Sequence, residues 1–195
     1  MHSPPSTDPG LAALPAFPAG AVPETPAALR QRGIVLRPCT TADIAFLREL
    51  YRQLRAEELA PLPWPQAQKN AFLDSQFALQ HRHYLTQYPD ADFCLVESAA
   101  QPIGRLYLWR QAPQFLVIDI SLLPQWRNSG IGTALMRGAQ ELARVGQADL
   151  NLHVDQRNSA ARRLYERLGF IATDEDGPYA GMRWQAPQEL GKQAS

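Results

Sequence analysis

Residues 115–144, FLVIDISLLPQWRNSGIGTALMRGAQELAR, decide the fold of this chain. The part from Phe115 to Ile120 is apolar and rich in β-branched residues, which is typical of a buried strand, and Pro124 ends it because proline has no N–H to give to a sheet. Residues 127–132, RNSGIG, form a glycine-bearing turn before an amphipathic helix that we expect from about Thr133 to Val145. Backbone amides at such a helix start, together with the positive end of the helix dipole, favour a bound anion. The stretch therefore predicts a phosphate-binding turn.

Two better-known phosphate motifs do not fit this turn. A P-loop needs a Gly-Lys-Ser/Thr ending, and the stretch has no lysine. A dinucleotide fingerprint needs a third glycine where Leu135 stands. What remains is Arg127-x-x-Gly130-x-Gly132 directly after a strand, with a turn that binds no ligand as the alternative.

A second block of sequence follows this helix. Residues 149–154 predict another strand, and the next helix is expected to start after Asn158, a good N-cap, and to end at Gly169. At 3.6 residues per turn, one face of this helix carries two polar and two apolar residues, namely Asn158, Ala161, Tyr165 and Leu168. Buried polar groups need partners. Either a ligand supplies them, or Asn158 only caps the helix and Tyr165 bonds to backbone.

The two blocks together resemble the GNAT superfamily of N-acetyltransferases. The first block resembles its cofactor signature, and the second, Asn158 followed by Leu164-Tyr165-x-x-x-Gly169-Phe170, resembles its other hallmark. The resemblance implies an α/β fold of the GNAT type, with a mixed, twisted central sheet flanked by helices. It also implies acetyl-CoA as the acyl donor and no metal.

The resemblance further implies which residues contact acetyl-CoA. It places the donor against the backbone at the end of the strand that starts at Phe115, against the turn and the start of the helix that follows it, and against the helix after Asn158. These residues are Ile120, Leu122, Arg127, Asn128, Ser129, Gly130, Ile131, Gly132, Thr133, Asn158 and Tyr165.

Direct transfer of an acetyl group to a primary amine in a ternary complex needs three kinds of group. A backbone N–H near Ile120 to Leu122 would polarise the thioester carbonyl. The resemblance makes Tyr165 the acid that protonates the departing thiolate. The base stays open: Asp119 and His153 lie on the two predicted strands, but each has a structural alternative, and ordered water can serve in some family members.

The rest of the chain predicts one domain with two tails. Residues 1–32 are rich in Pro and Ala without an apolar period, so we expect a disordered or extended tail, followed by the GNAT domain over 33–186 and a flexible C-terminal tail over 187–195. Within the domain, patterning predicts a strand over 34–36, two helices and a hairpin of strands. The resemblance makes Trp64, in a proline-rich break between those helices, a candidate wall of the acceptor site; the alternative is an aromatic ring held between prolines for packing.

Charge and cysteine content limit the classes of partner that we expect. The 195 residues carry a formal net charge of zero and two cysteines, which argues against nucleic acid or an anionic membrane as a partner and favours a cytoplasmic protein. We expect a small-molecule or peptide amine as acceptor, and the resemblance leaves room for a homodimer. Two other classes stay open: a non-catalytic acyl-CoA-binding regulatory module, and an interaction protein that acts through its N-terminal tail.

Overall fold

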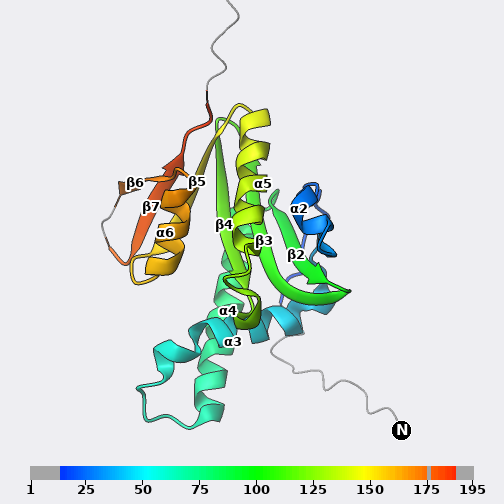
Figure 1. Ribbon diagram of the computed structural model, residues 1–195. Helices are drawn as coiled ribbons and strands as arrows, with labels where there is room; N and C mark the ends of the chain where they lie inside the picture. Colours follow the sequence, from blue (N-terminus) through cyan, green and yellow to red (C-terminus); the bar gives the residue numbers. More distant parts are fainter. Residues whose placement is uncertain (1–13, 175–176, 188–195) are drawn as a thin grey trace, which may run out of the picture.

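The computed structural model describes residues 14–174 and 177–187 (Figure 1). Seven strands among these residues form one sheet in the order β1-β2-β3-β4-β5-β7-β6. The strands are β1 (Ile34–Pro38), β2 (Asp92–Ser98), β3 (Gln101–Gln111), β4 (Gln114–Leu122), β5 (Asp149–Asp155), β6 (Ile171–Asp174) and β7 (Tyr179–Trp184). The helices are α2 (Ala27–Arg30), α3 (Ile44–Leu59), α4 (Gln66–Gln87), α5 (Ile131–Val145) and α6 (Ser159–Arg167), with short 3-10 turns η1 (Thr41–Asp43) and η2 (Pro124–Trp126).

The sheet is mixed, as predicted from the sequence. β4 and β5 pair in parallel, and the other neighbouring strands of the described sheet pair antiparallel. A parallel pair needs a crossover connection, because the chain must return to the end of the sheet where the first strand began before the second strand can run in the same direction. α5 makes this crossover.

The strands β4 and β5 pair along only half of their length. Their parallel ladder ends at Val117↔Leu152, although β4 stays paired with β3 up to Leu122 and β5 stays paired with β7 up to Asp155. A β-bulge at Ile118 lies at the separation point, since Val117 and Asp119 face consecutive residues of β3. A bulge adds a residue on one strand and bends it. The sheet therefore opens between β4 and β5.

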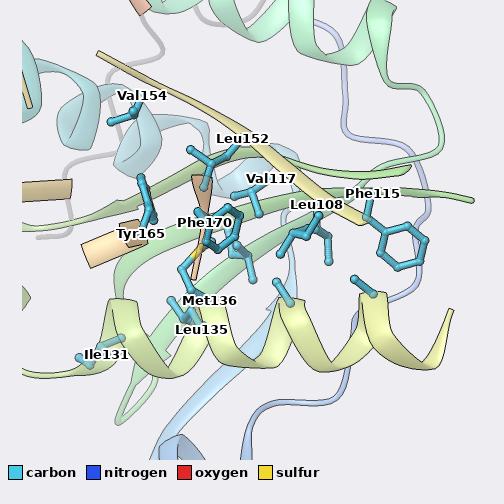
Figure 2. Close-up of a cluster of buried hydrophobic side chains, with 14 of the residues drawn as sticks. Leu108, Phe115, Val117, Ile131, Leu135, Met136, Leu152, Val154, Tyr165 and Phe170 are labelled. Carbon is cyan, nitrogen blue, oxygen red and sulfur yellow. The ribbon is translucent and has the colours of Figure 1, made fainter. Parts of the chain in front are cut away.

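Two apolar clusters cover the two faces of the sheet. One cluster joins α5 and α6 to the sheet, and the other joins α3 and α4 to the opposite face. Figure 2 shows that Tyr165 and Ile131 lie at one end of the first cluster, whereas Phe115 lies at the other end. In Figure 1, α3 and α4 form a hairpin that projects past one end of the sheet.

Residues 14–32, which we call the N-terminal strap, lie within the predicted tail but pack against both apolar clusters. Leu14 is buried in the α3/α4 cluster, whereas Leu29 is fully buried in the α5/α6 cluster. The Thr25 hydroxyl accepts the Leu36 N–H of β1 at 2.8 Å. The strap has no helical period, but a few well-separated apolar side chains are enough to anchor an extended segment. Residues 1–13 and 188–195, which belong to the predicted tails, lie outside the described residues.

No helix in the described part of the chain is long and apolar enough to cross a membrane. Within the same residues, no cluster of three or more His, Cys, Asp or Glu side chains is arranged to hold a metal ion.

Candidate active site

The predicted phosphate-binding turn connects η2 to α5. Gly130 is the N-cap of α5 and adopts the left-handed conformation, with φ 81° and ψ −5°. No side chain caps this helix, and the first backbone bond runs from the Ala134 N–H to the Gly130 carbonyl at 3.0 Å. The N–H groups of Ile131, Gly132 and Thr133 therefore precede the helix ladder and are available to an anion.

Two side chains of this turn donate to backbone carbonyl oxygens that precede it. The Arg127 Nε donates to the Leu122 carbonyl at 3.2 Å, and the Ser129 hydroxyl donates to the Trp126 carbonyl at 2.6 Å. Asn128, between them, is exposed and has φ 57°. Arg127 and Ser129 thus shape the backbone of the turn, whose amides are the groups best placed to contact an anion.

A cavity of about 350 Å³ lies where β4 and β5 separate. Residues 117–121 of β4 and 152–155 of β5 form two of its walls. Three residues of the second sequence block, Asn158, Ala161 and Tyr165, form another. The structure therefore brings five of the predicted site residues to this cavity: Asp119, Ile120, His153, Asn158 and Tyr165. The turn residues 127–133 are not among its lining residues. Leu122 does not line the cavity; its side chain is buried against β3.

Tyr165 is buried, with 7% of its surface exposed, and it borders the cavity. Its ring packs against Phe170 with 5.8 Å between ring centroids. Burial, with a smaller contribution from the Asp119 carboxylate, raises the pKa of Tyr165 to about 12. The phenol has no hydrogen-bond partner among the described residues, so its proton is available to a ligand.

Asn158 caps α6, as one of the two sequence interpretations stated. Its Oδ1 accepts the Ala161 N–H at 3.0 Å. Because Asn158 is also exposed and lines the cavity, its amide NH₂ remains available for a second role.

Asp119 is the centre of a hydrogen-bonded network on the α4 side of the cavity. Arg105, which is 3% exposed, donates to both carboxylate oxygens at 3.0 and 2.7 Å. The Ser121 hydroxyl donates at 2.6 Å and the Tyr84 hydroxyl at 3.3 Å. Each carboxylate oxygen thus accepts two bonds, which fills the usual capacity of a carboxylate.

His153 lies across the opening from Asp119. It is the exposed residue of β5 opposite Gly181 of β7, and it lines the cavity. Its imidazole has no hydrogen-bond partner in the described part of the chain. The two candidate bases therefore share one cavity but differ in how strongly their polar atoms are already engaged.

Sequence reasoning missed the residues that close the cavity from the α3/α4 side. These are Arg55, Gln80, Tyr84 and Tyr179. Gln80 accepts from Arg105 at 2.9 Å, so the helix and the strands are tied together by one network. None of these residues belongs to a motif. Trp64, the predicted wall, lies outside this cavity and packs edge-on against Phe72, with 5.8 Å between ring centroids.

Known proteins are similar to this chain in sequence and in fold. Residues 49–170 match the family model described as Acetyltransferase (GNAT) family. A segment of 89 residues, 45% of this chain, is 37% identical to the mycothiol acetyltransferase of Nocardiopsis dassonvillei and covers 24% of it. A segment of 88 residues, also 45% of the chain, is 28% identical to a Bacillus subtilis protein assigned as a ribosomal protein bS18-alanine N-acetyltransferase and covers 58% of it. The matches thus span only about a quarter of the mycothiol acetyltransferase and somewhat over half of the second relative.

Solved structures agree at the level of the fold. The PaiA N-acetyltransferase of Thermoplasma acidophilum in complex with coenzyme A superposes with a TM-score of 0.59 at 18% identity, covering 78% of this chain and 98% of that one. The YncA structure from Salmonella typhimurium with acetyl-CoA gives 0.52 at 18% identity, covering 84% and 99%. With a family model that matches well over half of its residues, the chain belongs to the GNAT family of acetyltransferases.

Proposed function

We propose that this protein transfers the acetyl group of acetyl-CoA to a primary amine by direct attack within a ternary complex. The observation that carries the proposal is the opening between β4 and β5, which has Tyr165 in its wall, together with the uncapped start of α5, which follows β4 in the chain. Acetyl-CoA supplies an activated thioester at the end of a long, amide-containing arm that begins at a diphosphate.

The residues present fit such a molecule at two points. The amides of residues 131–133 suit the diphosphate, because a helix start offers several donors to one anion. The separated halves of β4 and β5 leave backbone groups without a strand partner, and an extended arm with its own amides can pair with them as a strand would. Of the β4 backbone, Ile120 is better placed than Leu122 to polarise a carbonyl, since only Ile120 reaches the cavity.

Tyr165 acts mainly as a hydrogen-bond donor to the leaving sulfur. A phenol with a pKa of about 12 and a thiol near 8.5 make full proton transfer unfavourable by about 5 kcal/mol. A hydrogen bond to a charged acceptor stabilises that charge without a complete transfer. The raised pKa also keeps the phenol protonated at any working pH.

His153 is better suited than Asp119 to take the proton of the amine. To accept a proton, Asp119 would have to give up one of the four hydrogen bonds that Arg105, Ser121 and Tyr84 make to it. The exposed His153 imidazole has no hydrogen bond within the described residues that it would have to give up. Histidine is also the side chain that most readily exchanges a proton near neutral pH. We therefore assign the base to His153 and a structural role to Asp119.

The acceptor enters from the α3/α4 side, where Arg55, Gln80 and Tyr179 line both the cavity and an adjoining groove of about 500 Å³. The names of the relatives suggest two kinds of acceptor to try first: a small molecule of the mycothiol type, and a protein amino terminus that begins with alanine.

A thiol-release assay tests the proposal. The full chain is incubated with acetyl-CoA and, one at a time, with small primary amines, free amino acids, an amino sugar and a peptide that begins with alanine. We expect at least one acceptor to release coenzyme A well above the rate of hydrolysis and to gain 42 Da in mass. Binding of acetyl-CoA without release for any acceptor would instead favour the non-catalytic acyl-CoA-binding module.

A further inference from the structure

The N-terminal strap reaches the phosphate-binding turn through one side chain. The guanidinium of Arg32 donates from Nη1 to the carbonyl oxygen of Ser129 at 3.0 Å, across 97 positions of sequence. Arg32 lies before the region that the family model matches, whereas Ser129 lies within it. No motif in either sequence block includes Arg32.

The topology explains why these two residues meet. β1 starts at Ile34, which pairs with Ser98 at the end of β2, and β3 near its own start pairs with Leu122 at the end of β4. The start of β1 and the end of β4 therefore lie at the same end of the sheet, measured along the strand direction. Arg32 precedes β1 by two residues, and the turn follows β4, so both lie at this end of the sheet.

The strap holds Arg32 in place on both sides. Leu29 is fully buried beneath α5. The neighbouring Pro26 lies so close to α5 that a Cβ added at Gly138 would be 2.7 Å from the Pro26 Cγ. After Arg32, β1 is paired with β2 along all five residues. Arg32 thus reaches Ser129 from a fixed backbone, which reduces the entropy that an exposed arginine loses when it makes a bond.

The bond to Ser129 bears directly on the amide of Gly130. The Ser129 carbonyl and the Gly130 N–H belong to one peptide unit, and this unit is trans. In a planar trans peptide the C=O and the N–H point in opposite directions. By holding the carbonyl on one side, Arg32 fixes the N–H on the other side, and a charged donor on the carbonyl also polarises that N–H toward an acceptor.

We propose that Arg32 is a positioning residue of the diphosphate site: it fixes and polarises the Ser129–Gly130 peptide so that the Gly130 amide joins those of α5 in binding the anion. This inference rests on the proposed function, because it takes the diphosphate of acetyl-CoA as the anion. It gives the strap a role in donor binding, because the strap holds Arg32 beside the turn at this end of the sheet.

The test measures coenzyme A affinity by calorimetry in the full chain. Arg32→Ala should raise the Kd for coenzyme A about tenfold, since a charge-assisted hydrogen bond and a local positive charge are lost together. Arg32→Lys, which keeps the charge and one donor, should recover most of this loss. Arg30→Ala is the matched control: Arg30 is two positions away and equally charged, but it pairs with Glu24 instead of the turn. Its Kd should stay within about twofold of the wild type.

A second probe separates positioning from a general effect on folding. Pantetheine has the arm of coenzyme A but no diphosphate, so its affinity, measured by NMR titration at millimolar concentration, should be equal in the wild type and in Arg32→Ala. An equal loss for both probes, or no loss for coenzyme A, would overturn the role of Arg32 while the proposed function stands. If the wild type binds pantetheine but gains nothing from the diphosphate of coenzyme A, the anion site itself is refuted. Failure of the wild type to bind coenzyme A at all would overturn both proposals.

Discussion

The two sides of the proposed site are built from different kinds of group. The proposed donor side comprises Tyr165 in the cavity wall and residues 127–133, which are not part of the cavity lining. It uses mainly backbone amides of one turn and one helix start, with a single buried phenol. The acceptor side comprises Arg55, Gln80, Tyr84, Arg105 and Asp119, and it uses side chains from α3, α4, β3 and β4 that are far apart in sequence. The donor side is therefore local, whereas the acceptor side depends on tertiary packing.

This difference has a consequence for mutation. A backbone site tolerates many side-chain changes, provided that its conformation and its lack of negative charge are preserved. A buried side-chain network tolerates few, because each lost partner leaves another polar group unsatisfied. Changes on the acceptor side should therefore affect folding first, and changes on the donor side should affect binding or turnover first.

The largest effect is expected for Arg105→Met on the acceptor side. Arg105 is 3% exposed and neutralises Asp119, so its removal leaves a poorly solvated carboxylate and should lower the free energy of unfolding by about 3–5 kcal/mol. Urea denaturation measures this loss. Arg144→Met, which removes an exposed arginine bonded to Glu141 on α5, is the control and should leave the midpoint unchanged. A loss for Arg105→Met below about 1 kcal/mol would mean that packing, and not the ion pair, holds this side together.

On the donor side, Gly130→Asp should raise the Kd for coenzyme A at least about 100-fold. An aspartate at this N-cap would satisfy the free amides itself and would repel a diphosphate. Gly130→Ala is the control, since a Cβ at this position meets no atom within 4 Å. The alanine should cost about 1 kcal/mol of stability because φ is positive, with a much smaller change in Kd. Equal Kd values for the two variants would contradict an anion site at the start of α5.

Tyr165→Phe separates turnover from binding within the donor side. Loss of a hydrogen bond to a developing thiolate should lower kcat about 30-fold, while the Kd for coenzyme A stays nearly the same. Steady-state kinetics with the best acceptor and calorimetry measure the two quantities. Tyr88→Phe, outside the cavity and packed on Trp109, is the control. If Tyr165→Phe keeps the wild-type kcat, Tyr165 does not assist the leaving group.

A smaller effect is expected for His153→Gln. If the imidazole takes the proton from the amine, this change should lower kcat/KM about tenfold. Steady-state kinetics with the best acceptor measure it. Asp119→Asn should lower the free energy of unfolding, because Arg105 loses its charged partner, with a smaller loss of kcat/KM. The reverse result, a wild-type kcat/KM in His153→Gln and the larger loss in Asp119→Asn, would assign the base to Asp119.

The smallest effect concerns alkaline pH. Burial raises the pKa of Tyr165 to about 12, so the phenol should remain almost fully protonated at pH 10.5. At its ordinary pKa near 10, about three quarters of it would be ionised there. The rate at saturating substrates should therefore change less than about twofold between pH 9 and 10.5, measured while circular dichroism shows the protein folded. A decline to about a quarter would contradict the burial of a catalytic Tyr165.

The two sides also differ in how well the sequence predicts them. The turn at Gly130 and the helix starting at Asn158 could be predicted because glycine spacing and capping residues are local signals. Arg105 could not be assigned a partner, because its ion pair with Asp119 depends on the register between β3 and β4. The opening between β4 and β5 depends on the bulge at Ile118, which has no distinctive residue. The packing of the strap could not be predicted, because Leu29 is buried without belonging to a periodic apolar face.

The most direct test of the donor site is the thermal unfolding midpoint of the full chain with and without saturating acetyl-CoA. At about one hundred times the dissociation constant, ligand bound only to the native state adds about 2.7 kcal/mol, which corresponds to a shift of roughly 5–10 °C for a domain of this size. We predict this upward shift for the wild type and its loss in Gly130→Asp. An unchanged wild-type midpoint at millimolar acetyl-CoA would contradict a donor site at the start of α5.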